Sequence, residues 1–147
     1  MTHKDGEIGT GKIGDTNVPV YVDTTNILSD SNKKIISISS GQSHGLILDS
    51  NNLVWAWGSN NFGQLGDGTY IDKKTPVLIS TEDSLLRGRK IISVSAGLSH
   101  SIALDSAGVV YSWGNNDFGQ LGDSTNTSRY TCAHFSLFFH DFHKKIK

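Results

Sequence analysis

The sequence predicts an all-β protein built from repeated four-stranded antiparallel sheets, and three observations support this prediction. A segment of 37 residues that begins at Lys33 recurs 56 positions later with 22 identities. Glycine is abundant, at 16 of 147 residues, and short β-branched runs lie between the glycines. No segment shows a convincing helical period, apart from the polar linker 82–89. Short strands joined by tight turns are therefore expected.

Each repeat unit predicts four strands in a constant order. The first two are short and rich in β-branched or aliphatic residues, and the turn 49–52 carries the Asp and Asn that hairpins favour. The fourth has Pro76 near its beginning, where a missing N–H group is tolerated. The strands expected in the first complete unit are 34–39, 44–48, 53–57 and 75–79.

The third strand carries different side chains on its two faces. Residues alternate sides along a strand, so Leu53, Trp55 and Trp57 share one face. The other face carries Val54 and Ala56, which are small. A sheet with two apolar faces has to stack against neighbours on both sides, as a propeller blade does. The repeats therefore predict an incomplete β-propeller of four-stranded antiparallel blades.

Repeat boundaries divide the chain into four segments. A weak copy near the start is indicated by GKIGD (11–15), which resembles GQLGD (63–67), and by VPVYV (18–22), which resembles TPVLI (75–79). After Thr125 the expected strand with a proline is missing, and the rest has no visible relation to the repeats. The expected segments are a partial first repeat (1–32), a complete repeat (33–88), an incomplete second repeat (89–125) and a divergent tail (126–147), explained by disorder or by an error in the reading frame.

Composition disfavours several classes of function. The formal net charge of -1 gives no overall attraction to nucleic acid or anionic membranes, so direct nucleic-acid binding is not expected. No apolar run approaches the ~18 residues of a spanning helix, so no membrane insertion is expected. The single cysteine, Cys132, cannot form an intrachain disulfide, which favours a reducing compartment, the cytoplasm or nucleus.

Two long matching stretches carry a family resemblance. The stretch SSGQSHGLILDSNNLVWAWGSNNFGQLGDGT, with TPVLI behind it and a second copy over 95–125, resembles the regulator of chromosome condensation repeat family. A WD repeat is disfavoured, because its period is about 40–45 residues and it ends in Trp-Asp. The resemblance covers roughly residues 8–125 and implies a seven-bladed propeller. The chain holds about two and a half such repeats, so a fragment of a longer propeller is expected, or a short protein that self-associates through unpaired blades.

The glycine-rich stretch WGSNNFGQLGDGT (57–69) could be mistaken for a phosphate-binding loop. Such a loop needs Lys-Ser/Thr before a helix, whereas Gln64 and Leu65 stand there and no helix is expected. The motif also returns at 113–125, and a nucleotide site is not usually needed once per blade. It is therefore interpreted as a structural signature. The signature residues are Gly41, His44, Trp57, Gly58, Gly63, Gln64, Leu65, Gly66, Gly97, His100, Trp113, Gly114, Gly119, Gln120, Leu121 and Gly122.

His44 and His100 occupy equivalent positions in the two copies and have two interpretations. The structural one is a buried or half-buried histidine that hydrogen-bonds the backbone of its own blade. The resemblance implies the other, since histidines at this motif position lie near the GTPase-facing surface of the exchange factor of the family. Asn61 and Asp117 differ between the copies, in a loop expected to reach the propeller face. The residues predicted as partner contacts are His44, Asn61, His100 and Asp117.

The sequence shows no arrangement typical of an enzyme. No two carboxylates have a context that favours acid–base catalysis, and Cys132 has no activating partner. His134, His140 and His143 in the tail lack supporting metal ligands. No catalytic residue, metal, cofactor or small-molecule substrate is therefore expected. The expected function is a protein–protein interaction module. The alternative, implied by the resemblance, is a guanine nucleotide exchange factor for a Ran-like small GTPase.

Overall fold

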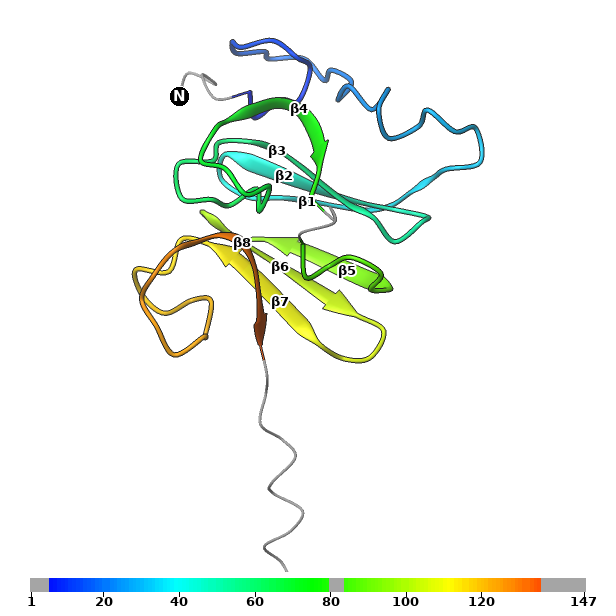
Figure 1. Ribbon diagram of the computed structural model, residues 1–147. Coiled ribbons are helices and arrows are strands. Elements are labelled where there is room, and N and C mark those ends of the chain that lie inside the picture. Colours follow the sequence, from blue (N-terminus) through cyan, green and yellow to red (C-terminus); the bar gives the residue numbers. More distant parts are fainter. Residues whose placement is uncertain (1–5, 80–83, 136–147) are drawn as a thin grey trace, which may run out of the picture.

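The computed structural model describes residues 6–79 and 84–135, which form two stacked four-stranded sheets (Figure 1). We call them blade 1 and blade 2. Blade 1 comprises β1 (Ile35–Ser40), β2 (His44–Asp49), β3 (Val54–Gly58) and β4 (Lys73–Leu78). Blade 2 comprises β5 (Ile91–Ala96), β6 (His100–Asp105), β7 (Val110–Gly114) and β8 (Arg129–Phe135). Neighbouring strands are antiparallel in chain order, which confirms the predicted all-β blades.

The core lies between the two blades, and the strand alternation decides which side chains enter it. Val54 and Ala56 on β3 face blade 2 and are fully buried. Tyr111 and Trp113 on β7 pack against them from blade 2. Because the two blades are copies, the small face of one sheet meets the aromatic face of the next. The predicted two-faced strand is therefore confirmed, and its two faces are complementary.

An N-terminal arm, residues 6–28, covers part of the other side of blade 1 (Figure 1). Trp55 and Trp57 point to this side and pack with Ile27 and Val22 of the arm. The expected resemblance of 18–22 to a fourth strand does not produce one, since this segment has no strand structure. A fourth strand pairs with the third strand of its own blade. Both described sheets already have four strands, so neither includes residues 18–22.

The structure differs from the expectation for the divergent tail. Residues 129–135 form β8, which pairs with β7 as Tyr111↔His134 and Gly114↔Arg129. The second repeat is thus a four-stranded blade, although Cys132 stands where the fourth strand of blade 1 has Pro76. Backbone groups on the outer edge of β7 accept a partner strand of almost any sequence, which explains the difference. The remainder of the tail, 136–147, lies outside the described residues.

Within residues 6–79 and 84–135, the structure holds no helix that is long and apolar enough to span a lipid bilayer.

The fourth strand of blade 1 begins at Lys73 and ends at Leu78, rather than covering 75–79 as predicted. Pro76 lies inside this strand and is tolerated because β4 is at the sheet edge.

Candidate functional site

The two long glycine-rich loops lie at the same end of their blades. In blade 1, His44 at the start of β2 pairs with Gly58 at the end of β3. The β1–β2 loop and the β3–β4 loop are therefore neighbours. The same pairing joins His100 to Gly114 in blade 2. We call this side of the molecule the loop end, and it holds every residue predicted as a partner contact.

Each long loop is organised around a buried asparagine that the sequence analysis did not single out. Asn60 Nδ2 donates to Thr69 O at 2.9 Å and to Asp67 Oδ1 at 3.1 Å. Its Oδ1 atom accepts a hydrogen bond from Leu65 N at 3.0 Å. Asn116 makes the equivalent bonds in blade 2. The occurrence of asparagine in both copies was the signal available in the sequence.

The turn within the first loop touches the next blade. Gly63 and Gly66 both have φ near +75°, a conformation that side chains disfavour. A Cβ atom at Gly66 would lie 2.6 Å from Trp113 Nε1, which leaves no room for one. Trp113 Nε1 in turn donates to Gln64 O at 2.9 Å. The motif therefore joins two blades as well as turning the chain.

A third copy of this turn lies in the N-terminal arm. Trp57 Nε1 donates to Glu7 O at 2.9 Å, which matches the indole–carbonyl bond of blade 2. A Cβ atom at Gly9 would lie 2.7 Å from Trp57 Nε1, and Gly9 has φ +73°. GEIGT (6–10) is therefore the equivalent of GQLGD, and the alignment of GKIGD (11–15) with that motif was wrong.

His44 crosses from one blade to the next. Its Nε2 atom lies 2.9 Å from Ser101 Oγ, and Ser101 Oγ donates to Gln64 O at 2.7 Å. The predicted hydrogen bond to the backbone of its own blade is therefore corrected to a bond to a hydroxyl of the following blade. His44 is only 3% exposed, which contradicts its prediction as a partner contact.

The hydrogen bonds of Ser101 assign the tautomer of His44. Because the Ser101 hydroxyl donates to Gln64 O, it accepts from His44, whose proton is then on Nε2. The buried Nδ1 atom has no hydrogen-bond partner among the described residues. Burial, and to a lesser extent the nearby His100, lowers the pKa of His44 to about 4. His44 is thus held neutral between the blades.

The other predicted contact residues lie on the surface of the loop end. Asn61 and Asp117 are exposed, and His100 is half-buried. The structure adds two aromatic side chains beside them, Phe62 at 40% exposure and Phe118 at 93%. The loop that carries Phe62 lies against blade 2, where a Cβ at Gly63 would be 2.4 Å from Tyr130 Cα. No described blade follows Phe118. Sequence reasoning missed both because a Phe in a repeated motif resembles a core residue.

The aspartates act within turns and loops. Asp49 Oδ1 accepts from Asn51 N at 2.9 Å and Leu53 N at 3.0 Å, so it caps the β2–β3 hairpin as the sequence analysis expected. Asp105 does the same in blade 2. Asp123 accepts from the Thr125 side chain and pairs with Arg129 at 2.7 Å. The Thr125 bond is the main cause that lowers the pKa of Asp123 to about 2.

Metal or thiol chemistry finds little support at the described positions. Residues 6–79 and 84–135 contain no group of three or more His, Cys, Asp or Glu side chains placed to hold a metal ion. Cys132 is buried, and burial raises the pKa of its thiol to about 12. A thiol of that kind is protonated at neutral pH and is a poor nucleophile.

Comparison with protein families decides the class of the repeats. The model described as "Regulator of chromosome condensation (RCC1) repeat" matches residues 51–104 and 107–134. A second model of the same description matches 35–64 and 91–120. The chain belongs to the RCC1 repeat family. Its blades are therefore RCC1 repeats, and the resemblance inferred from the sequence is confirmed.

Curated relatives of this RCC1 repeat chain are much longer proteins. The human E3 ubiquitin-protein ligase HERC2 is 32% identical over 122 residues, which cover 83% of this chain and 2% of HERC2. The ultraviolet-B receptor UVR8 of Arabidopsis thaliana is 40% identical over 100 residues, which cover 67% of this chain and 22% of the receptor.

Solved RCC1 propellers share the fold. The structure of Kap60 bound to yeast RCC1 (Prp20) matches with a TM-score of 0.74 and 27% identity, over 93% of this chain and 33% of that chain. The structure of Prp20p from Saccharomyces cerevisiae matches with a TM-score of 0.72 and 29% identity, over 92% and 34%. The RCC1 repeat chain thus spans about a third of these propellers.

The close approach of the RCC1 turn to Trp113 yields a prediction for two matched glycines. Gly66→Ala should lower the free energy of unfolding by roughly 2 kcal/mol, because it adds backbone strain and a clash with the indole. Gly68→Ala shares the positive φ but has no atom within 4 Å of a Cβ, so about 1 kcal/mol is expected. Urea unfolding measures both, and equal losses would contradict the role of the contact.

Proposed function

We propose that the chain is a protein–protein interaction module, without catalysis of its own, that binds a protein partner through its loop end. The RCC1 repeats and the exposed loop end support this proposal. Phe62 and Phe118 project there beside Asn61 and Asp117, and Leu98 is also exposed. Exposed aromatic side chains next to polar groups are typical of protein contact surfaces. The single observation that carries the proposal is the 93% exposure of Phe118 on a loop that Asn116 holds through hydrogen bonds.

The solved relatives support one class of partner. The yeast propeller is known bound to Kap60, and the Prp20p study concerns its binding to Gsp1p and histones. A small GTPase of the Gsp1p type is therefore a candidate partner here, within the cytoplasm or nucleus. Nucleotide exchange is the less favoured alternative, because this chain spans about a third of those propellers.

Replacement of Phe118 tests the proposal. A photo-crosslinking amino acid at position 118 identifies the partner, and binding of the purified partner is then measured by calorimetry. Phe118→Ser should raise Kd about tenfold or more, as loss of an aromatic anchor does. Leu85→Ser is the matched control, since Leu85 is exposed at the opposite end of the blades and should leave Kd unchanged.

Two outcomes count against these assignments. Equal effects of Phe118→Ser and Leu85→Ser would show that the loop end is not the binding surface. Accelerated release of a fluorescent GDP analogue from a Gsp1p-type GTPase, on addition of this chain alone, would instead favour nucleotide exchange over simple binding.

A further inference from the structure

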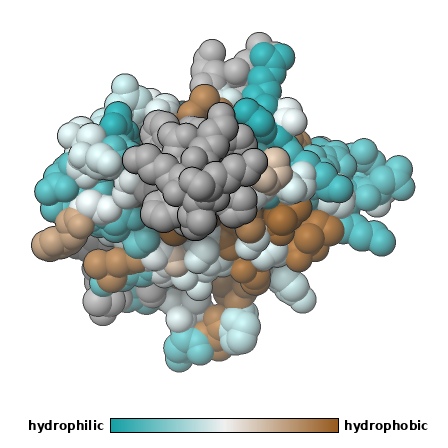
Figure 2. Space-filling model, turned by 90° about the horizontal axis from the view of Figure 1, so that it is seen from below, coloured by the Kyte–Doolittle hydropathy of each residue, from teal (hydrophilic) through white to brown (hydrophobic). Residues whose placement is uncertain are grey.

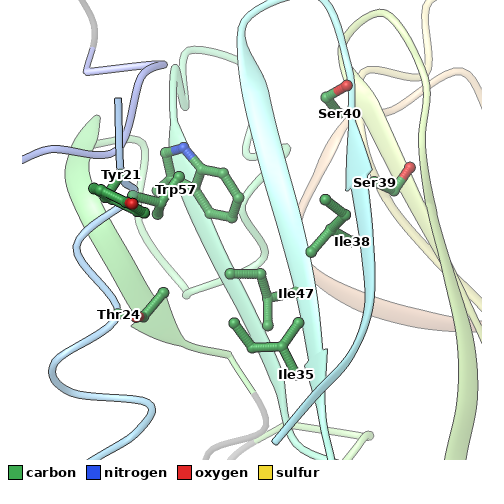
Figure 3. Close-up of a pocket in the computed structure, with 9 residues that line it drawn as sticks. Tyr21, Thr24, Ile35, Ile38, Ser39, Ser40, Ile47 and Trp57 are labelled. Atoms are coloured by element: carbon green, nitrogen blue, oxygen red, sulfur yellow. The ribbon is translucent and has the colours of Figure 1, made fainter. Parts of the chain in front are cut away.

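A pocket of about 440 Å³ opens on the side of blade 1 that points away from blade 2 (Figure 3). It lies between the N-terminal arm and the strands β1 and β2. Ile38, Ile47 and Trp57 give it an apolar floor. The remaining lining residues are Tyr21, Val22, Thr24, Ile35, Ser39 and Ser40. The exposure of Ile38 shows that this apolar surface lacks a complete cover.

The equivalent side of blade 2 is fully covered, by blade 1. Val94, Ala103 and Trp113 stand 56 positions after the three residues of the pocket floor. All three are buried in the core between the blades, against side chains of β2 and β3 such as Leu48 and Val54. The pocket is therefore the place that the β2 and β3 side chains of a preceding blade would fill.

Blade 2 carries the matching surface on the side that no described blade covers. Ile102, Leu104 and Val110 are the repeat equivalents of Leu46, Leu48 and Val54, and they are only half-buried. Figure 2 views the molecule from this side and shows apolar side chains gathered on one part of it. The chain therefore presents both halves of its own blade–blade interface, one on each blade.

The N-terminal arm occupies part of the place of a preceding blade. In the interface between the blades, Trp113 Nε1 donates to Gln64 O, and at the pocket Trp57 Nε1 donates to Glu7 O. An indole has one N–H group, so Trp57 cannot donate to both the arm and an incoming loop. The loop that would come with blade 2 of another molecule carries Gln120 at this position.

We propose that blade 2 of one molecule docks on blade 1 of a second copy, head to tail, and that the N-terminal arm restrains this association by holding Trp57. The occupant is a second copy because the interface already exists within the chain and both of its surfaces are repeated. The contact is heterologous, because it joins two different surfaces, so further copies can add in the same head-to-tail orientation. In this contact His100 of one molecule faces Gly45 of the next, whereas within the chain the equivalent His44 faces Ser101. Glycine has no hydroxyl for the histidine to bond, so the association between molecules is weaker than the stacking of the two blades.

Release of the arm in the full chain tests this proposal. Gly9→Leu places a side chain against Trp57 and should lift the arm. Gly14→Leu is the matched control, because Gly14 also has a positive φ but no atom lies within 4 Å of a Cβ there. In sedimentation velocity up to about 100 µM, Gly9→Leu should associate about tenfold or more tightly than the wild type and than Gly14→Leu.

A second pair of variants identifies the surfaces. Gly6→Leu should displace the same turn of the arm, and with it Glu7 O, through a clash with β4, since a Cβ at Gly6 would lie 2.6 Å from Lys74 Cα. This variant should therefore also associate. Val110→Lys in the Gly9→Leu background should abolish association with itself. This double variant should still bind one wild-type molecule, whose blade 2 is intact.

The proposal has three ways to fail. If the Gly9→Leu and Gly6→Leu chains are folded but both stay monomeric, a second copy does not occupy the pocket on blade 1. Assembly that survives Val110→Lys would place the contact elsewhere. Equal association of the wild type would show that the arm restrains nothing. Circular dichroism of each variant shows whether the chain is folded.

Discussion

Replacing Trp113 by alanine should lower the free energy of unfolding by about 4 kcal/mol, the range for a large aromatic side chain in a packed core. Trp113 is fully buried between the blades and packs against the small face of blade 1. Its removal leaves a cavity at the centre of the larger core cluster. Urea unfolding followed by circular dichroism gives the loss from the midpoint and slope.

Trp57→Ala is the matched control for this prediction. Trp57 occupies the equivalent position and also donates its indole N–H to a loop carbonyl. It faces the pocket, where only the N-terminal arm covers it. The free energy of unfolding should fall by roughly 2 kcal/mol, because the Trp57 side chain loses packing against the arm rather than against a complete blade. Equal losses for the two substitutions would show that a complete blade stabilises the buried tryptophan no more than the N-terminal arm does.

A Trp113→Phe variant separates packing from hydrogen bonding. Gln64 O keeps its bond from Ser101 Oγ when the indole N–H is lost, so no buried carbonyl is left without a partner. The expected loss is about 1–2 kcal/mol, from volume alone. A loss as large as that of Trp113→Ala would assign the effect to the indole–carbonyl bond instead.

Acidification should destabilise the protein between about pH 6.5 and 4 through His44. The folded-state pKa of His44 is about 4, below the ordinary value of 6.5. The unfolded chain therefore binds more protons in this window, and stability falls as the pH falls. The full contribution is present above pH 6.5 and is lost by about pH 4. It amounts to about 3 kcal/mol.

His44→Gln isolates this effect. A Gln Nε2 group can donate to Ser101 Oγ as the histidine does, but it does not titrate. The free energy of unfolding of His44→Gln should therefore vary much less between pH 6.5 and 4. The depressed pKa of Asp123 acts below this window, since it removes stability only as the pH falls from 3.8 towards 2. His100→Gln is the matched control and should keep most of the wild-type slope. A variant curve parallel to that of the wild type would rule out His44 as the cause.

The elements and the hairpins were largely predictable because they depend on neighbours in the sequence. Strand alternation placed Trp57 and Val54 on opposite faces, and the structure confirms it. Asp49 caps its hairpin through amides only two and four residues away. Such contacts are repeated wherever the repeat occurs. The two copies of the motif were therefore enough to infer them.

The candidate site was less predictable because its contacts join different repeats. His44 was expected to bond within its own blade, but its partner Ser101 lies 57 residues later and is a glycine in the equivalent position of blade 1. Periodicity shows which face a side chain occupies and cannot show which copy it meets. The exposure of Phe118 depends likewise on the neighbouring blade rather than on the motif itself.

The sequence by itself determined the repeat, the four-stranded blades and their two apolar faces, because period and alternation are local properties of the chain. Only the tertiary structure decided that GEIGT is the third copy of the turn, since the evidence is the bond from Trp57 to Glu7. It also showed that 129–135 pairs with β7 as β8 although the proline of β4 is missing there, because backbone pairing with β7 does not require that proline. The physical reason is the same in both cases: stacking and edge pairing depend on which surfaces meet in space, and two identical motifs acquire different neighbours.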